Sequence, residues 1–421
     1  MRNSGWRPIL TIGVHSVQFG VGIAKYSEVL SVPTSRRQFF HRAAQTAAGV
    51  VLAKTVLDSL GSIERASAAE TPEPAPLREC MFYAKTGGKA VRCELCPRAC
   101  EVPEGERGFC RVRENQEGTF RTLVYDRVCT LNVDPIEKKP FFHYLPGTQA
   151  VSVATAGCNF TCKFCQNWQI SQARPEDIRH DPLTTTQLTG LAADKGVPTI
   201  AYTYNEPTVF YEYVHETAKL GRTRDVGSVI VSAGYIAEKP MRELAKHLTA
   251  VKVDLKAFTD KFYREVCGGT LQPVLDTLKT VHSTGMHLEV VVLLIPGMND
   301  GAEEIKKMCG WIVTNLGPDV PVHFSRFQPL YQMKNLPETP VETVERARDL
   351  AVAAGVHYAY VGNVAFHPHG NTWCHSCKMK LIERVGYRVD SNLIQDGKCP
   401  KCGTRIPGIW SQKQALAFQP K

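Results

Sequence analysis

Three cysteines in the middle of the chain have the type and spacing of ligands to an iron–sulfur cluster. Cys158, Cys162 and Cys165, the cysteine trio, lie in the run GCNFTCKFCQNW, where the spacing is C-x3-C-x2-C and an aromatic residue precedes the last cysteine. A four-iron cluster held only by protein uses four thiolates. Three thiolates leave one iron without a protein ligand, and an open iron can bind a substrate or a cofactor. The motif therefore predicts a cluster that does chemistry.

Two structural interpretations compete with this one. Structural zinc sites take four ligands, usually as C-x2-C pairs, and free cysteines are common in protein cores. The uneven spacing of the trio does not suit a zinc site. The apolar run at 150–154 is typical of a strand that leads into a loop. This context favours a cluster-binding loop.

A second cysteine pattern, near the C-terminus, is typical of a single metal ion. Cys374, Cys377, Cys399 and Cys402, the C-terminal cysteines, form two C-x2-C pairs with 21 residues between them. This arrangement predicts a zinc-ribbon-like module, and Gly403 fits the turn after the second pair. A rubredoxin-like iron site would use the same ligands. We expect zinc, but the sequence does not separate the two metals.

A third group of thiols precedes the trio. It comprises the N-terminal cysteines Cys93, Cys96, Cys100 and Cys110, in the runs CELCPRAC and GFC. The proline at 97 and the run GERG at 105–108 predict turns around them. Four thiolates suffice either for structural zinc or for a second iron–sulfur cluster that relays electrons, and both alternatives stay open. The remaining cysteines are expected in the core: Cys80, Cys129, Cys267 and Cys309.

Composition favours a metal-binding globular protein. The chain has 421 residues and fifteen cysteines, and cysteines grouped at metal-ligand spacings indicate metal binding rather than a disulfide framework. Residues 1–69 hold eight Lys/Arg and three Asp/Glu, so they carry +5 of the net charge of +9. The remaining +4 does not indicate a nucleic-acid partner. The sequence has no run of 18 apolar residues, so we expect no transmembrane span.

The N-terminus reads as a targeting segment rather than as part of the fold. The run SRRQFF at 35–40 resembles a twin-arginine export signal, a weakly apolar stretch follows at 43–60, and ASA at 66–68 offers a cleavage site. These features predict export to the periplasm, and a basic tail on a cytoplasmic protein is the alternative. We expect a signal or tail at 1–69, a Cys-rich region at 70–147, a core at 148–370, the zinc-ribbon-like module at 371–410 and a tail at 411–421.

The core must position the trio, and its sequence alternates strand-like and helix-like segments. Strands are predicted at 151–155, 199–203, 228–232, 250–255, 288–294, 322–327 and 358–361. Helical patterns include 241–248, 275–283, 302–314 and 341–354. Such alternation predicts an α/β fold with parallel strands. The count is slightly short for a complete eight-fold barrel, and chemistry is expected at the carboxyl ends of the strands.

The motifs together resemble those of a known family. GCNFTCKFCQNW resembles the cluster motif of the radical S-adenosylmethionine (SAM) superfamily. Its combination with CELCPRAC, YTYNEPT, VDLK, IPG and CGTRIPGIW across residues 78–410 is similar to the AmmeMemoRadiSam system radical SAM enzymes. That group is related to pyruvate formate-lyase activating enzyme. The resemblance implies a partial (β/α)6 TIM-like barrel, in which a 4Fe-4S cluster cleaves SAM and yields a 5′-deoxyadenosyl radical that takes hydrogen from an unknown substrate.

The resemblance also implies roles for residues near the cluster. Phe164 would shield the cluster near the adenine, with a core aromatic as the alternative. Asp254 and Lys256 point to the same side of their strand and would orient SAM, with a surface salt bridge as the alternative. The turn at 294–300 would pass the adenine. No residue is assigned to the hydrogen abstraction itself.

Glu206 matches the acidic position of the Gly-Gly-Glu-type motif that binds the SAM amino group in this superfamily. A carboxylate is a suitable acceptor for an ammonium group. Tyr204 and Asn205 stand where the motif has its two glycines. The alternative role for Glu206 is a helix N-terminal acid before Pro207. Weaker candidates at the strand ends are Ser232, Gly234, Tyr235, His323 and Arg326.

Two classes of function follow. In the first, the protein is a radical SAM enzyme similar to glycyl-radical activating enzymes. It then needs a low-potential electron donor, and proteins are among its candidate substrates. The subgroup name implies Amme-type and Memo-family partners. In the second, it is an iron–sulfur and zinc protein for electron transfer or metal handling, without SAM cleavage.

Overall fold

The computed structural model describes residues 77–421, which form one compact unit. The twin-arginine-like run at 35–40 and the predicted cleavage site at 66–68 lie outside the described residues. No helix within 77–421 is long and apolar enough to span a membrane. All fifteen cysteines fall within this part of the chain, and none of them forms a disulfide.

Seven parallel strands and one antiparallel strand form the central sheet, with the order β16-β15-β14-β13-β12-β11-β9-β8. The parallel strands are β9 (Gln149–Ala154), β11 (Thr199–Tyr202), β12 (Gly227–Ser232), β13 (Ala250–Asp254), β14 (His287–Leu294), β15 (Val322–Arg326) and β16 (Ala359–Gly362). All seven predicted strands are confirmed. The antiparallel edge strand β8 (Thr130–Pro135) was not predicted. The sheet is open, because β8 and β16 are its two edges.

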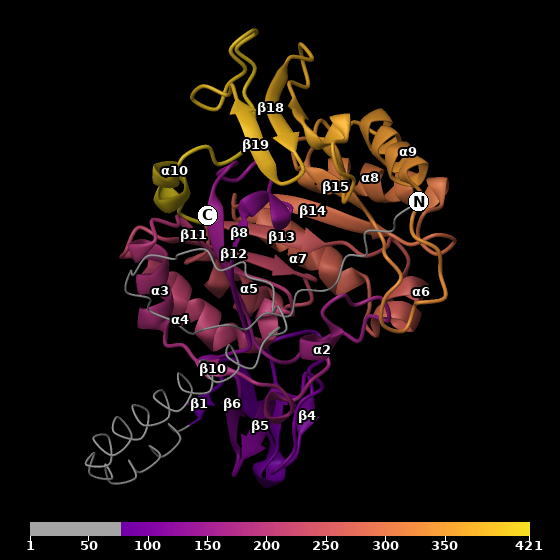
Figure 1. Ribbon diagram of the computed structural model, residues 1–421. Coiled ribbons are helices and arrows are strands. Elements are labelled where there is room, and N and C mark those ends of the chain that lie inside the picture. The colour runs from indigo at the N-terminus through magenta and orange to yellow at the C-terminus, as the bar shows by residue number, and fades with distance from the viewer. Residues whose placement is uncertain (1–76) are drawn as a thin grey trace, which may run out of the picture. The chain divides into compact units, whose positions relative to one another are not determined.

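Helices connect the parallel strands and cover the sheet (Figure 1). They are α3 (Thr185–Asp194), α4 (Tyr211–Arg222), α5 (Glu238–Ala245), α7 (Gln272–Ser283), α8 (Ala302–Leu316) and α9 (Val341–Ala353), with the short α2 (Trp168–Ser171), α6 (Asp260–Phe262) and α10 (Gln412–Ala417). The four helices predicted from the sequence are present. The strands are buried almost throughout, as expected for parallel strands with helices packed on them.

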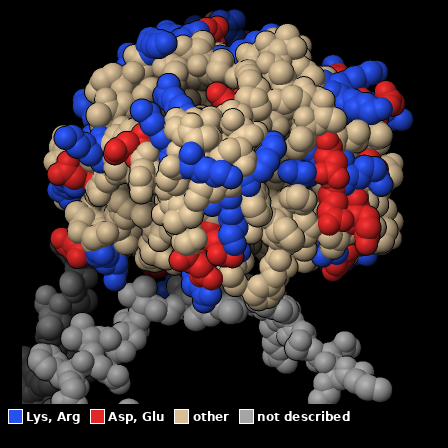
Figure 2. Space-filling view, turned by 90° about the horizontal axis from the view of Figure 1, so that it is seen from above, with Lys and Arg blue, Asp and Glu red and all other residues tan. Residues whose placement is uncertain are grey.

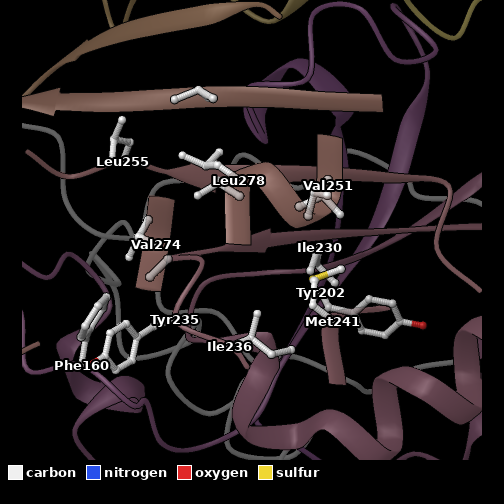
Figure 3. Packing of buried hydrophobic residues seen from close by; sticks show 14 of the residues in the cluster. Phe160, Tyr202, Ile230, Tyr235, Ile236, Met241, Val251, Leu255, Val274 and Leu278 are labelled. Carbon is white, nitrogen blue, oxygen red and sulfur yellow. The ribbon is translucent and has the colours of Figure 1, made fainter. Parts of the chain in front are cut away.

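The packing between sheet and helices forms the main core (Figure 3). Tyr202, Ile230 and Val251 come from the neighbouring strands β11, β12 and β13, and Met241 of α5 lies against them in the view. Burial of each such side chain contributes roughly 1.5–3 kcal/mol. The core therefore fixes the strand ends, where the predicted site residues lie.

Small sheets flank the central one. On the N-terminal side they comprise β1 (Arg78–Glu79), β5 (Arg113–Gln116) and β6 (Thr119–Thr122); β2 (Tyr83–Lys85), β3 (Val91–Cys93) and β4 (Glu101–Val102); and the pair β7 (Arg127–Val128) and β10 (Asp181–Pro182). On the C-terminal side, β17 (Thr372–Trp373), β18 (Lys380–Val385) and β19 (Arg388–Asn392) form one sheet. These two groups lie at opposite ends of the central sheet (Figure 1).

Candidate functional site

The cysteine trio lies in the loop that follows β9, at the carboxyl end of the parallel sheet. Gly157, just before the first cysteine, has φ +90°, and its NH donates to the carbonyl of Ile170 at 2.9 Å. On the far side of the loop, the NH groups of Thr161 and Lys163 donate to the carbonyls of Cys267 and Val266, both at 2.9 Å. The loop is therefore held from both sides by backbone contacts.

The spread of the three thiols fits a cluster better than a single ion. Within residues 77–421, the three sulfur atoms do not all lie within 4.8 Å of one another, as ligands of a single metal ion would. In a cluster each thiolate binds a different iron, so the ligands are further apart. Burial raises the pKa of Cys158 well above its usual value, and Glu206 adds to this effect. Glu206 therefore lies close enough to the trio to influence its charge.

Glu206 is buried and already holds two strand ends together. Its Oε1 accepts from the Thr208 NH at 3.1 Å, the Thr208 hydroxyl at 2.7 Å and the Ser232 hydroxyl at 2.7 Å, and its Oε2 accepts from the Ala233 NH at 2.8 Å. The carboxylate thus caps the 3₁₀ turn Pro207–Phe210, which is the alternative role considered for it. Each carboxylate oxygen has about two acceptor positions, and Oε2 accepts only one of these bonds, so it retains capacity for a further donor.

The two residues that replace the glycines of the family motif are built into this site. Tyr204 has φ +69°, a conformation that favours glycine, and its hydroxyl donates to Asp134 at 2.6 Å. The side-chain NH2 of Asn205 donates to the carbonyl of Gly157 at 2.9 Å. The backbone therefore keeps a glycine-like bend at Tyr204, while Asn205 ties the end of β11 to the cysteine loop.

Asp254 and Lys256 form an ion pair at the end of β13, with Nζ and Oδ2 3.5 Å apart. Lys252, on the same face of the strand, also pairs with Asp254 and is almost completely buried. The Lys256 ammonium lies 5.6 Å from the centre of the Phe164 ring, and only 12% of its side chain is exposed. The pair therefore lies in the site rather than on the open surface, and the buried Phe164 lies beside it.

Charges in this group stabilise one another. Burial alone lowers the pKa of Lys256, but Asp254 and Cys162 outweigh it and raise that pKa. Burial raises the pKa of Asp254, and the two lysines reverse this effect and hold it below its usual value. A hydrogen bond with Cys267 lowers the pKa of Cys162, and Lys256 lowers it further. Lys256 and Asp254 therefore stabilise each other's charged forms, and Lys256 also shifts Cys162 toward its thiolate form.

The structure adds two residues that sequence reasoning did not place here, Lys252 and Cys267, and it shows how the predicted turn at 294–300 is fixed. Lys252 could have been found from its i, i+2 spacing to Asp254. Cys267 was expected in the core; it is fully buried, as expected, but it also neighbours Cys162. Asn299, in the turn at 294–300, donates to the carbonyl of Lys256 at 2.6 Å and so fixes that turn beside β13. The position of Cys267 depends on chain folding and has no local signal.

Two of the weaker candidates have other partners. His323 is buried, and its Nε2 lies 2.7 Å from Oε2 of Glu289, which makes it a satisfied core histidine. Arg326 donates to the carbonyl of Thr339 at 2.6 Å. Ser232 does belong to the site through its bond to Glu206. Tyr235 packs on Phe160 of the cysteine loop, with ring centres 4.7 Å apart (Figure 3).

The C-terminal cysteines come together at two turns of matching geometry. The Lys378 NH donates to the carbonyl of Cys374 at 3.0 Å, and the Gly403 NH donates to that of Cys399 at 2.9 Å. Lys378 and Gly403 have φ +59° and +71°. Sulfur–sulfur distances across the group are 3.7 Å for Cys374 and Cys402 and 3.6 Å for Cys377 and Cys399. This is a four-cysteine group of single-ion dimensions.

The N-terminal cysteines surround a small enclosed cavity. All four line it together with Arg113 and Asn159. Asn159 follows Cys158 in the sequence, so this group adjoins the trio. The structure thus brings the N-terminal cysteines and the trio together. The C-terminal cysteines lie in the loops beside β17, β18 and β19, and this sheet is at the other end of the molecule (Figure 1).

Comparison with known proteins identifies the family. Residues 152–312 match the radical SAM superfamily. An uncharacterized protein of Methanocaldococcus jannaschii is 42% identical over 332 residues, which is 78% of this chain and 99% of that protein. The chain therefore belongs to the radical SAM superfamily, and it is a radical SAM enzyme by its fold and its cysteine loop.

One more distant relative refines this placement. The pyruvate formate-lyase-activating enzyme of Clostridium pasteurianum is 24% identical over 174 residues, which cover 41% of this chain and 71% of that enzyme. The chain is thus related to pyruvate formate-lyase activating enzyme. A solved radical SAM methyltransferase from Sphaerobacter thermophilus aligns with a TM-score of 0.41 and 16% identity, over 69% of this chain and 78% of that one.

Membership implies a 4Fe-4S cluster and SAM as cofactors, and the residues present fit both. The trio offers three thiols from one loop, spread more widely than the ligands of one ion. An ammonium and a carboxylate at the end of β13, together with Glu206, offer charges that complement the zwitterionic end of SAM. The predicted cofactor residues therefore lie in one site.

Proposed function

We propose that the protein reductively cleaves SAM at a 4Fe-4S cluster held by Cys158, Cys162 and Cys165, and that its substrate is a protein. The observation that carries this proposal is the convergence of the trio with Glu206 and the Asp254–Lys256 pair at the carboxyl ends of the parallel strands. Parallel α/β folds place their chemistry at these ends.

When bound, the cluster supplies the electron that splits SAM into methionine and a 5′-deoxyadenosyl radical, which abstracts hydrogen. The chain's own residues bind and orient. Lys256 would attract the SAM carboxylate, and Asp254 and the free position of Glu206 would accept from its amino group. Phe164, which is buried beside Lys256, would help to exclude water and so protect a reactive intermediate.

The proposal of a protein substrate rests on the relationship to pyruvate formate-lyase activating enzyme, whose name states that it activates another enzyme. In this role the protein needs a low-potential electron donor. Membership in the AmmeMemoRadiSam system, proposed from the motifs at 78–410, would make Amme-type and Memo-family proteins the candidate partners. These proteins are therefore the first candidate substrates to add to the enzyme.

The alternative function is electron transfer or metal handling without SAM cleavage. It is favoured by the number of cysteine groups and by the four hydrogen bonds that already occupy Glu206. The Asp254–Lys256 pair argues against this alternative. A cluster that only carries electrons does not need an ion pair beside an iron that is open to SAM.

The deciding experiment is SAM cleavage by anaerobically reconstituted protein with dithionite. We expect 5′-deoxyadenosine and methionine in equal amounts, measured by chromatography, and no product from the C158A/C162A/C165A variant. Cys309→Ala is the matched control, since this buried cysteine of α8 lies in the core and its loss should leave product formation in place. Product no higher than that of the triple variant would favour the alternative.

A second experiment identifies the substrate. Candidate partner proteins labelled with deuterium are added one at a time, and the deuterium content of 5′-deoxyadenosine is measured by mass spectrometry. Transfer from one partner would identify it as the hydrogen donor. Unlabelled product with every protein, but labelled product with a small molecule, would contradict a protein substrate.

Further parts of the proposal concern architecture and location. We propose that the open sheet is a partial (β/α)6 barrel, with domain limits at 70–147, 148–370 and 371–410, and that the C-terminal cysteines bind zinc in a ribbon-like module.

We also propose export through the signal at 35–40. Fractionation of cells that express the protein with a C-terminal tag tests export, and a tag found only in the cytoplasm would contradict it.

A further inference from the structure

The four N-terminal cysteines converge although the sequence spreads them over two hairpins. Cys93 ends β3, Cys100 precedes β4, and its carbonyl accepts from the Cys93 NH at 2.9 Å. Cys96 lies in the turn between them, and Cys110 arrives from the segment before β5. All four line one enclosed cavity. The chain therefore surrounds a space with thiols instead of packing them against one another.

The distances separate a cluster from a single ion. With Zn–S bonds of about 2.3 Å, tetrahedral ligands are about 3.8 Å apart, and the C-terminal cysteines show this spacing at 3.6 and 3.7 Å. Within residues 77–421, no three of the N-terminal thiols all lie within 4.8 Å of one another. In this respect they match the trio, the established cluster motif of the family, and differ from the C-terminal cysteines.

A buried cation faces the same cavity. Arg113 lines it, and its side chain is only 1% exposed. The Nη2 atom pairs with Oε2 of Glu212 at 2.5 Å, while Nη1 is buried without a partner among the described residues. A buried donor without an acceptor costs free energy. Sulfides or thiolates of a cluster in the cavity would supply the missing acceptor, and the cation would offset negative charge there.

We infer that Cys93, Cys96, Cys100 and Cys110 bind a second 4Fe-4S cluster, with all four irons held by thiolates, rather than zinc. Such a cluster has no open iron for SAM. Its role is then to carry electrons.

The N-terminal cysteines and the trio are close neighbours in the structure. The Arg98 side chain, from the turn between Cys96 and Cys100, donates to the carbonyl of Asn159 at 2.7 Å. Asn159 lines the N-terminal cavity and is the residue after Cys158. A one-electron reductant, such as a flavin or iron–sulfur protein, would reduce the second cluster, which would pass that electron on to the trio's cluster and return to its oxidised state. This relay rests on the proposed function, whereas binding of the second cluster does not.

The test uses the full chain reconstituted anaerobically with iron and sulfide. We expect about eight iron atoms and eight sulfides per chain in the unmodified protein and about four of each in C158A/C162A/C165A. The electron paramagnetic resonance signal of the reduced triple variant should not respond to SAM. Sulfide is decisive, because zinc and rubredoxin-like sites contain none. No sulfide in a folded triple variant would overturn the inference, whatever its zinc content.

A second variant guards against misfolding of the first. C96A/C100A should lose about half of the sulfide, and its remaining signal should still shift on addition of SAM. The unmodified protein gives an independent answer: two reduced signals, of which only one responds to SAM, support the inference, and a single SAM-responsive signal with about four sulfides contradicts it. Circular dichroism checks the fold of both variants.

The relay is tested by the choice of reductant. In C96A/C100A, SAM cleavage driven by reduced flavodoxin should be lost relative to cleavage driven by dithionite, which reaches clusters directly. If the ratio of flavodoxin-driven to dithionite-driven SAM cleavage were equal in the variant and in the unmodified protein, the relay would be overturned. If the unmodified protein fails to cleave SAM with dithionite but holds eight sulfides, the proposed function fails and the second cluster stands.

Discussion

At the residue scale, the cysteine loop depends on a backbone position where a side chain does not fit. A Cβ atom on Gly157 would lie 2.5 Å from Cγ1 of Val112 and 2.8 Å from the carbonyl oxygen of Cys110, and the residue has φ +90°. The contact joins the loop of the trio to the segment that carries the last N-terminal cysteine. The missing Cβ of Gly157 therefore allows the loop of the trio to lie directly against the segment that carries Cys110.

Gly157→Ala should destabilise the protein and reduce its iron content. Gly196→Ala is the matched control, because Gly196 has φ +62° but nothing within 4 Å of its Cβ position. The control should lose roughly 1–2 kcal/mol of unfolding free energy from backbone strain alone. Urea denaturation and iron analysis measure both variants. An equal loss in the two would mean that the contact with Cys110 is unimportant.

Lys139 should make stability depend on pH in the alkaline range. Burial lowers the pKa of Lys139 to about 8, whereas an unfolded lysine titrates near about 10.4. Between these values the unfolded chain holds a proton that the folded chain has released, so stability rises with pH. The difference in unfolding free energy between the unmodified protein and Lys139→Met should therefore increase from pH 8 to pH 10. A constant difference would contradict the lowered pKa.

At the element scale, the sequence predicted what depends on local pattern. The seven parallel strands and four helices have strong apolar periodicity, and each was found within a few residues of its prediction. The short strands of the N-terminal sheets and the edge strand β8 were missed, because they lack the continuous apolar runs of the predicted strands. Such strands are defined by their partners, which lie far away in the sequence.

The C-terminal sheet is held to the central sheet by a buried ion pair. Arg384 of β18 lies 3.6 Å from Oε1 of Glu137, and both side chains are 1% exposed or less. Its Nη2 also donates to the carbonyl of Phe142 at 2.7 Å. The guanidinium therefore joins a late strand to the segment that precedes β9.

Arg384→Ala should destabilise the protein by roughly 3–5 kcal/mol, because it leaves Glu137 buried without its cation. Arg388→Ala is the control, since Arg388 lies on the neighbouring β19 and pairs only with exposed Asp390; little change is expected. Urea denaturation measures the loss. Addition of Glu137→Gln to the Arg384→Ala variant should recover part of the stability, and no recovery would assign the loss to packing instead.

At the scale of the whole molecule, one face of the described residues carries charges of both signs. On the face shown in Figure 2, Lys and Arg are interspersed with Asp and Glu. A face of this kind offers little long-range attraction for a partner of either charge.

The chain that begins at residue 77 should be a complete functional unit. Residues 77–421 form one compact unit that contains every cysteine. We therefore expect this shortened protein to match the full chain in iron, sulfide and zinc content, in melting temperature and in SAM cleavage. Metal analysis and calorimetry make the comparison. Loss of either cluster on truncation would contradict this expectation and assign the first 76 residues a part in the site.

The sequence by itself identified the trio and the C-terminal group as candidate ligands, and it predicted the alternation of strands and helices, because these depend on spacing along the chain. Only the tertiary structure decided which groups are neighbours. It placed Gly157 against Cys110, brought Ser232 and Ala233 to Glu206, and drew the two pairs of C-terminal cysteines together. These distances join residues far apart in the sequence, so they are set by packing between elements and not by any local pattern.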